Sequence, residues 1–213
     1  MKHKSIIWAL GLLLAGGLML SSCTKNDDNT IALIGTEYYI DDILAVVSDS
    51  AFLANFGSYP HGSIPPKIEG SYVLDPKQRV YSNVQGWPLT LVEPNVYLRF
   101  GKQHNGVAVM DLNEATEQVT DTVFVMGNND DFTVYFVEDK AYDVPFDNTT
   151  YHVKMKRGII MKGKVAETGL ANFRMASIVM EIEDNSNGAL SQYPVGSYFI
   201  YKDGDNLAEF FEW

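Results

Sequence analysis

Residues 151–165 read YHVKMKRGIIMKGKV and give the strongest indication of the fold. Apolar and charged residues alternate over most of it, which is the period-two pattern of a β-strand with one buried face. Residues 173–182 form a second long run after a turn signal at 167–169, so the two runs predict an antiparallel pair. Gly158 and Gly163 lie inside the first run and are typical of strongly curved sheet.

Shorter strand candidates surround this pair along the chain. Turn signals separate them, among them Asn105-Gly106, residues 127–130 and a hairpin turn at Asp203-Gly204. Strands joined by short turns are antiparallel neighbours, and about eight to ten of them must close into a barrel or split into a two-sheet sandwich. The long, curved central pair favours the barrel, with the sandwich as the alternative. The candidates are residues 68–74, 96–100, 107–110, 119–126, 132–138, 195–201 and 207–213.

One helix is predicted, over residues 40–56, before the first strand. Its apolar or small residues recur at helical spacing, at Ile40, Ile43, Leu44, Val47, Ala51 and Ala54. Asp41 and Asp42 lie in its first turn, and Gly57 is placed to end it. Residues 31–213 are therefore expected to form a single β-rich domain, all-β with a minor helical part.

The start of the chain has the pattern of a lipoprotein signal peptide. Lys2 and Lys4 precede an apolar run, and Ser21 and Ser22 lead to Cys23, the one cysteine of the sequence. We expect residues 1–22 to be removed and Cys23 to carry fatty acyl groups such as palmitate, which hold the protein at a membrane. Residues 23–30 would then be the lipidated cysteine and a flexible acidic tether. The alternative is an ordinary cleaved signal peptide that leaves Cys23 as a free thiol.

Residues 24–29, TKNDDN, resemble the acidic export tag behind the lipidated cysteine of Bacteroidetes-type surface lipoproteins. The resemblance implies an outer-membrane protein that is lipid-anchored and exposed on the cell surface.

The charge of the chain limits its partners. It has 16 basic and 27 acidic residues, and without the leader, which holds two of the basic ones, the net charge is −13. Such an acidic body argues against binding to nucleic acid or to anionic lipid. We expect membrane contact through the lipid anchor alone, and no cofactor; the oligomeric state stays open.

Gly70-Ser71-Tyr72 begins the strand series directly after the helix and loop. This arrangement, followed by a β-meander, resembles the lipocalins, which carry Gly-x-Trp at the corresponding place; here Tyr72 replaces the Trp. The resemblance implies a lipocalin-like (calycin) barrel shaped as a cup, with a ligand site in its mouth.

Four side chains are candidates for binding a ligand in such a cup. Met155, Met161 and Met175 suit an adaptable apolar cavity, although ordinary core filling uses methionine as well. Trp87, between Gly86 and Pro88, is placed to stack on a sugar or to cover one end of the barrel. The expected ligand is a small hydrophobic molecule or a glycan.

A cationic stripe lies along residues 151–165. Lys154, Lys156, Lys162 and Lys164 share one face by alternation, and Arg157 adds charge at the centre. The stripe is a candidate patch for an anionic glycan, a lipid head group or an acidic partner. The alternative is an ordinary solvated face balanced by neighbouring Asp and Glu.

No pattern predicts a metal site or catalysis. Asp203, Asp205, Asn206 and Glu209 are spaced like oxygen ligands of Ca²⁺, but the complete loop pattern is missing. His61, His104 and His152 are isolated, and no nucleophile, zinc or phosphate motif occurs. The sequence thus predicts no enzyme but a lipid-anchored envelope protein that holds a small apolar or amphipathic ligand. The alternative is a structural or accessory subunit of a surface complex that binds glycans or adheres.

Overall fold

The structure is a computed structural model. The leader, Cys23, the tether and Trp87 lie outside the residues that it describes. Those residues are 40–45, 49–60, 62–86, 89, 91–114, 117–146, 149–184, 188, 191 and 193–212.

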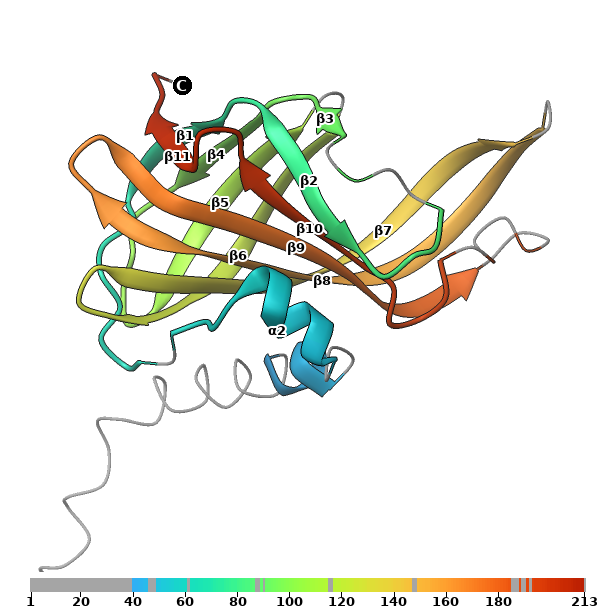
Figure 1. The fold of residues 1–213 in the computed structure, drawn as a ribbon, viewed down its shortest axis with the longest axis horizontal. Coiled ribbons are helices and arrows are strands. Elements are labelled where there is room, and N and C mark those ends of the chain that lie inside the picture. The colour runs from blue at the N-terminus through green and yellow to red at the C-terminus, as the bar shows by residue number, and fades with distance from the viewer. Residues whose placement is uncertain are drawn as a thin grey trace, which may run out of the picture. The chain divides into compact units, whose positions relative to one another are not determined.

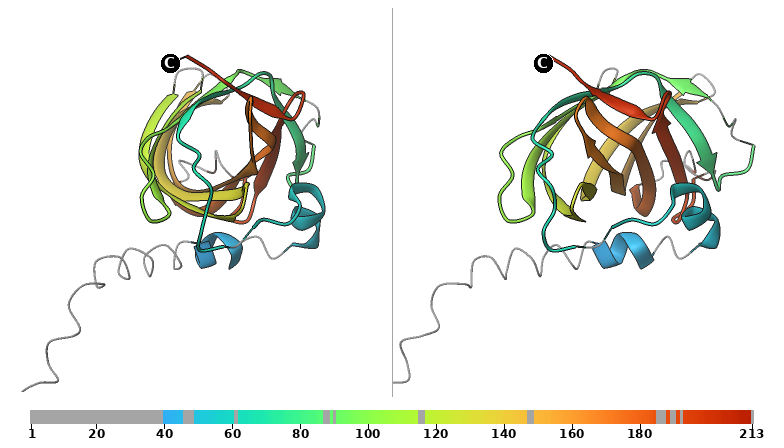
Figure 2. Two further views of the ribbon diagram at one scale, coloured as in Figure 1. Left: turned by 90° about the vertical axis from the view of Figure 1, so that its left-hand side faces the viewer. Right: turned by 60° about the vertical axis from the view of Figure 1, so that its left-hand side comes forward.

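The described strands form one antiparallel sheet that closes on itself (Figures 1 and 2). The closed ring has the order β11-β1-β4-β5-β6-β7-β8-β9, and β9 returns to β11. The predicted barrel of antiparallel strands is therefore confirmed, and the two-sheet sandwich is not what forms. The strands are β1 Gly70–Leu74, β2 Lys77–Ser82, β3 Val92–Glu93, β4 Val96–Phe100, β5 Val107–Glu114, β6 Glu117–Asn128, β7 Asp131–Phe146, β8 Thr149–Ala166, β9 Gly169–Asp184, β10 Tyr198–Asp203 and β11 Leu207–Phe210.

Three strands of the barrel are interrupted, so that two labelled segments follow each other along one line: β10 and β11, β1 and β2, and β3 and β4. β9 pairs first with β11 and then with β10, and β1 and β2 pair with β11 and β10 on the other side. β3 pairs in turn with β2, and β4 pairs with β1. The ring is therefore an eight-stranded up-and-down meander, an architecture compatible with a lipocalin-like barrel. The turn at Asp203-Gly204 was predicted to be a hairpin; this is wrong, because β10 and β11 run on in one direction along β9.

Asp203 stabilises the backbone at the interruption between β10 and β11. Its buried carboxylate accepts backbone N–H groups from Asp75 at 2.9 Å, Asp205 at 3.1 Å and Leu207 at 3.3 Å. These contacts join the β10–β11 break to the break between β1 and β2. Burial of the carboxyl group, with a smaller contribution from Asp205, raises the pKa of Asp203 to about 6.

The raised pKa of Asp203 predicts that acidification stabilises the fold. The folded pKa lies above the ordinary value of 3.8, so the folded state binds the proton more tightly. The free energy of unfolding should rise by about 1–2 kcal/mol between pH 7 and pH 5 through this group. Urea unfolding at both pH values checks this. Asp203→Asn should remove the gain and the exposed control Glu212→Gln should keep it; equal pH profiles for the wild type and Asp203→Asn would contradict it.

The inner core fills the barrel near the turns β4–β5, β6–β7 and β8–β9. Alternate residues of every strand of the ring meet there. Among the large buried side chains of this core are Tyr72, Leu74, Leu98, Phe100, Phe132 and Phe173. Packing of this kind, with no disulfide, is the main source of stability in a domain of this size.

Two short helices cover part of the outer face, where a single helix over 40–56 was predicted. Residues 40–45 are helical, and α2 Ser50–Phe56 begins separately, because Asp49 has an extended backbone and caps Ala51 N–H at 2.7 Å. Gly57 ends α2 as predicted, with a φ of 84°. Neither helical segment among the described residues has the length and apolar character to cross a bilayer.

An outer core holds these helices against the barrel wall. Ile43, Phe52 and Phe56 pack with Ile160, Ala176, Ile178 and Tyr198 of the strands beneath. Gly158 makes room for this contact, because a Cβ atom there would lie 2.7 Å from Ile43 Cγ1. This glycine therefore serves close packing as well as the curvature predicted from the sequence.

Candidate functional site

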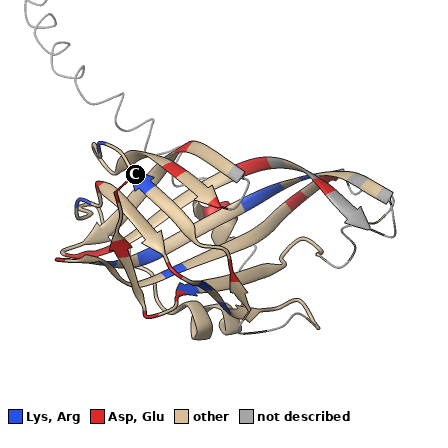
Figure 3. Ribbon diagram, turned by 90° about the horizontal axis from the view of Figure 1, so that it is seen from above, with Lys and Arg blue, Asp and Glu red and all other residues tan. Residues whose placement is uncertain are grey.

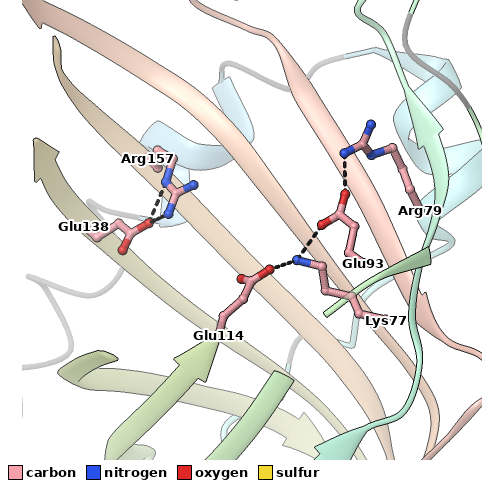
Figure 4. Close-up of polar contacts among 6 residues, drawn as sticks. All are labelled: Lys77, Arg79, Glu93, Glu114, Glu138 and Arg157. Atoms are coloured by element: carbon pink, nitrogen blue, oxygen red, sulfur yellow. Dashed lines mark hydrogen bonds and ion pairs between the residues drawn. The ribbon is translucent and has the colours of Figure 1, made fainter. Parts of the chain in front are cut away.

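Six charged side chains line the barrel interior beyond the inner core (Figure 4). We call them the charged belt. Three are basic and three are acidic, so their charges balance. The belt comprises Lys77 and Arg79 from β2, Glu93 from β3, Glu114 from β5, Glu138 from β7 and Arg157 from β8.

Strand alternation directs the belt residues inward. Glu114 follows Leu112 by two positions, Glu138 follows Phe136, and Arg157 precedes Ile159. Leu112, Phe136 and Ile159 all belong to the inner core, and residues two apart on a strand share a face. β5, β7 and β8 thus carry inner-core residues and, further along each strand, one belt residue.

Lys77 is the most enclosed member of the belt. Its ammonium group lies 2.8 Å from Glu93 Oε2, makes a second ion pair with Glu114, and lies 4.3 Å from the ring centroid of Tyr201. Two carboxylates and an aromatic face therefore replace the water that a lysine normally keeps.

Arg79 shares the Glu93 carboxylate with Lys77. Its guanidinium group pairs with Glu93 Oε1 and lies over the rings of Phe199, at 5.1 Å, and Tyr201, at 5.8 Å. Burial, together with the charge of Glu93, raises the pKa of the Tyr201 hydroxyl well above its usual range.

Arg157 and Glu138 form the ion pair on the opposite wall. Arg157 Nε donates to Glu138 Oε1 at 2.6 Å, and Nη2 contacts the same oxygen. Figure 4 shows this pair across from the Lys77 group, with Glu114 reaching toward Lys77.

The charged belt is not expected to stabilise the fold more than apolar side chains would in the same positions. Taking charges out of water costs several kcal/mol per ion, and well-packed apolar side chains often stabilise a fold as well or better. Paired charges inside a barrel can, however, exchange a protein partner for a ligand group of the same sign. This arrangement can hold polar or charged groups of a small molecule beside an apolar interior.

The three candidate methionines do not come together. Met161 and Met175 are register partners on β8 and β9 and are buried in the inner core. Met155 lies in a separate small cluster with Val153 and Val179. All three are buried, and the structure places only two of them against each other.

The cationic stripe does not form one surface either. Lys154 pairs with Glu183, Lys156 with Glu181 at 3.0 Å, and Lys164 approaches Asp130 at 3.8 Å, so these three lie on a charge-balanced outer face. The hydrogen bonds to Glu183 and Glu181 raise the pKa of Lys154 and of Lys156. Figure 3 shows basic and acidic positions interspersed along the strands.

Lys162 and Arg157 leave the stripe in opposite directions. Lys162 donates to Ser58 O at 2.7 Å and lies 5.2 Å from the Phe56 ring, beside Arg174, which donates to Asn55 O. Burial, and then the charge of Arg174, lower the pKa of Lys162. Both cations hold the carboxyl end of α2. Arg157 instead points into the barrel.

In the part of the chain that the structure describes, neither the acidic turn nor the histidines form a metal site. The Asp203 oxygens accept backbone N–H groups, and among the described residues no three His, Cys, Asp or Glu side chains are placed to hold a metal ion. His152 Nδ1 lies 2.6 Å from Asp143 Oδ1 on an exposed hairpin, His104 lies in a turn, and His61 is outside the described residues.

A surface hollow of about 240 Å³ lies apart from the belt, between residues 83–85 and 194–197. The amide of Asn83 closes it from inside, donating to Gly196 O at 2.9 Å and accepting Tyr198 N–H at 2.8 Å. Its central polar side chain is thus already used by the protein.

The fold and the belt define the class as an eight-stranded antiparallel barrel with a charged interior. In comparisons with known proteins, no family, no curated protein and no solved structure matches this chain. Function therefore has to be argued from the site itself.

Proposed function

We propose that this protein binds a small amphipathic molecule inside the barrel, with the polar group of the ligand at the charged belt. The observation that carries the proposal is the belt itself: three acidic and three basic side chains face the interior of a closed barrel beside its apolar core. An apolar cup would bind hydrocarbon without selecting a polar group. The belt adds that selection, because buried charges reject a ligand that leaves them unpaired.

Native mass spectrometry of protein purified from its own envelope tests the proposal. We expect a fraction of the wild type to carry one small molecule. The double variant Glu138→Gln/Arg157→Gln should lose most of it, because both ionic contacts on that wall are removed. The matched control is Lys154→Gln/Glu183→Gln, which removes an outer-face ion pair. A wild type without bound molecules, or equal loss in both variants, would contradict the proposal.

We also propose that the barrel is attached to the outer membrane, facing outward, through acyl chains on Cys23. The support is the sequence of residues 1–29, with its apolar run, small residues and acidic tag. Growth with a clickable palmitate analogue should label the wild type and leave Cys23→Ala unlabelled. Label on Cys23→Ala, or a wild type without label, would contradict the anchor.

A second candidate function is that of an accessory subunit, and the edge of β7 favours it. β6 pairs with β7 only up to Phe124 and Tyr135, so from Phe136 to Phe146 this edge has no strand partner among the described residues. Such an edge can accept a strand of another protein. A photo-crosslinking residue at position 137 should then capture one defined partner in cells that position 109, exposed on β5, does not. Equal capture at both positions would argue against this function.

A further inference from the structure

Water reaches the charged belt unevenly. The side chains of Lys77, Arg79 and Glu93 are 3%, 6% and 15% exposed. Glu114 and Arg157 are 26% and 25% exposed, which makes them the two most accessible members. The accessible part of the belt thus consists of one carboxylate and one guanidinium group, which come from different strands.

These two residues lie on either side of a split in the barrel wall. β6 and β7 separate beyond the Phe124–Tyr135 pair, and the β7–β8 hairpin runs on past the other strands (Figure 1). Glu114 is on β5, next to β6, and Arg157 is on β8, next to β7. The strands next to the two that border the split, β5 and β8, therefore carry opposite charges.

An apolar contact continues from these charges toward the inner core. Val119 of β6 is half-buried and packs against that core, and its register partner on β5 is Leu112. Val119 lies on the border of the split, and Leu112 lies beside it on β5. A hydrocarbon chain that entered at the split would meet these side chains first.

We propose that the ligand is a zwitterionic amphiphile, with its cationic group at Glu114, its anionic group at Arg157 and its hydrocarbon chain against Val119 and Leu112. This inference rests on the proposed binding function and adds the chemical class of the ligand. Glu114 is paired with Lys77 and Arg157 with Glu138, so a ligand group binds here by taking the place of a protein partner of the same sign. A ligand with a single charge can do so at only one of the two accessible groups, whereas a zwitterion can do so at both and preserves the neutrality of the belt.

Three probes with the same chain separate the possibilities: dodecylphosphocholine, dodecyl phosphate and dodecyltrimethylammonium. Calorimetric titration of the purified protein, below the micellar concentration of each probe, measures the affinities. We expect dodecylphosphocholine to bind about tenfold more tightly than either singly charged probe, because it gains one more charge-assisted contact.

Variants assign each end of the zwitterion. Glu114→Gln should weaken dodecylphosphocholine about tenfold and leave dodecyl phosphate unchanged, whereas Arg157→Gln should weaken both of these and leave the cationic probe unchanged. Glu114→Asp should restore part of the loss, which a merely structural effect would not do. Lys154→Gln is the surface control, and thermal unfolding shows whether each variant is folded.

The outcomes distinguish this inference from the proposed function. Tighter binding of either singly charged probe, or equal binding of all three, overturns the zwitterion and leaves ligand binding standing. If none of the three probes binds while protein purified from its envelope still carries a small molecule, the zwitterion is likewise overturned and ligand binding stands. Absence of both signals overturns the two proposals together.

Discussion

Replacement of Lys77 by Met is expected to lower the free energy of unfolding by about 3 kcal/mol or more. Methionine has a similar length, so the loss comes from charge and not from a cavity. Lys77 is almost fully buried, and its removal leaves the Glu93 and Glu114 carboxylates facing each other inside the barrel without their shared cation. Breaking a buried ion pair from one side costs about 3–5 kcal/mol, because a charge stays behind without its partner. Equilibrium urea unfolding measures the loss.

Two further variants define the cause. Lys102→Met, at an exposed position, should change the free energy of unfolding by less than about 0.5 kcal/mol. Adding Glu114→Gln to Lys77→Met should recover about 1 kcal/mol or more, because it removes the carboxylate that has lost its ion pair with Lys77, whereas Glu93 still pairs with Arg79. If Lys77→Met were as stable as Lys102→Met, the belt would not be held together by Lys77.

The second large effect is expected at the helix on the outer wall. Phe52 is buried, stacks on Phe56 at 5.0 Å and meets Tyr198 edge-on at 5.3 Å. Phe52→Ala should lower the free energy of unfolding by about 3–5 kcal/mol, as truncation of a packed aromatic side chain does. Thermal and urea unfolding both measure this change.

The neighbouring residue is the matched control. Leu53 is on the same helix but 48% exposed, so Leu53→Ala should cost less than about 1 kcal/mol. Similar small losses for Phe52→Ala and Leu53→Ala would mean that α2 is not part of the cooperative unit of the barrel.

The curved antiparallel sheet was predictable because its signals are local. Alternation in 151–165 and Asn105-Gly106 depend on neighbouring residues alone, and β8 and the β4–β5 turn form there. β2 was missed because its pattern is inverted. Lys77 and Arg79 face inward, whereas Val80 packs on the outer core, so the usual reading of charged residues as solvent-facing fails.

The belt was not predictable either, because most of its members are far apart in the sequence. Its acidic members, Glu93, Glu114 and Glu138, come from separate strands and meet only when the ring closes. Arg157 was noticed, but as a part of the lysine stripe; it alternates with those lysines and shares the inward face of Ile159. The local signals in the sequence were two basic residues at alternate positions, 77 and 79, and the position of Arg157 among the apolar residues of its strand.

The pairing of β11 has a consequence for how this chain acquires its structure. This four-residue strand joins β1 to β9, and it is synthesised after every other strand of the ring. Until it emerges the meander is an open ribbon with two unsatisfied borders, and contacts between distant segments form slowly. The barrel can therefore close only after β11 has been synthesised, so the chain completes its interior as the last step of folding.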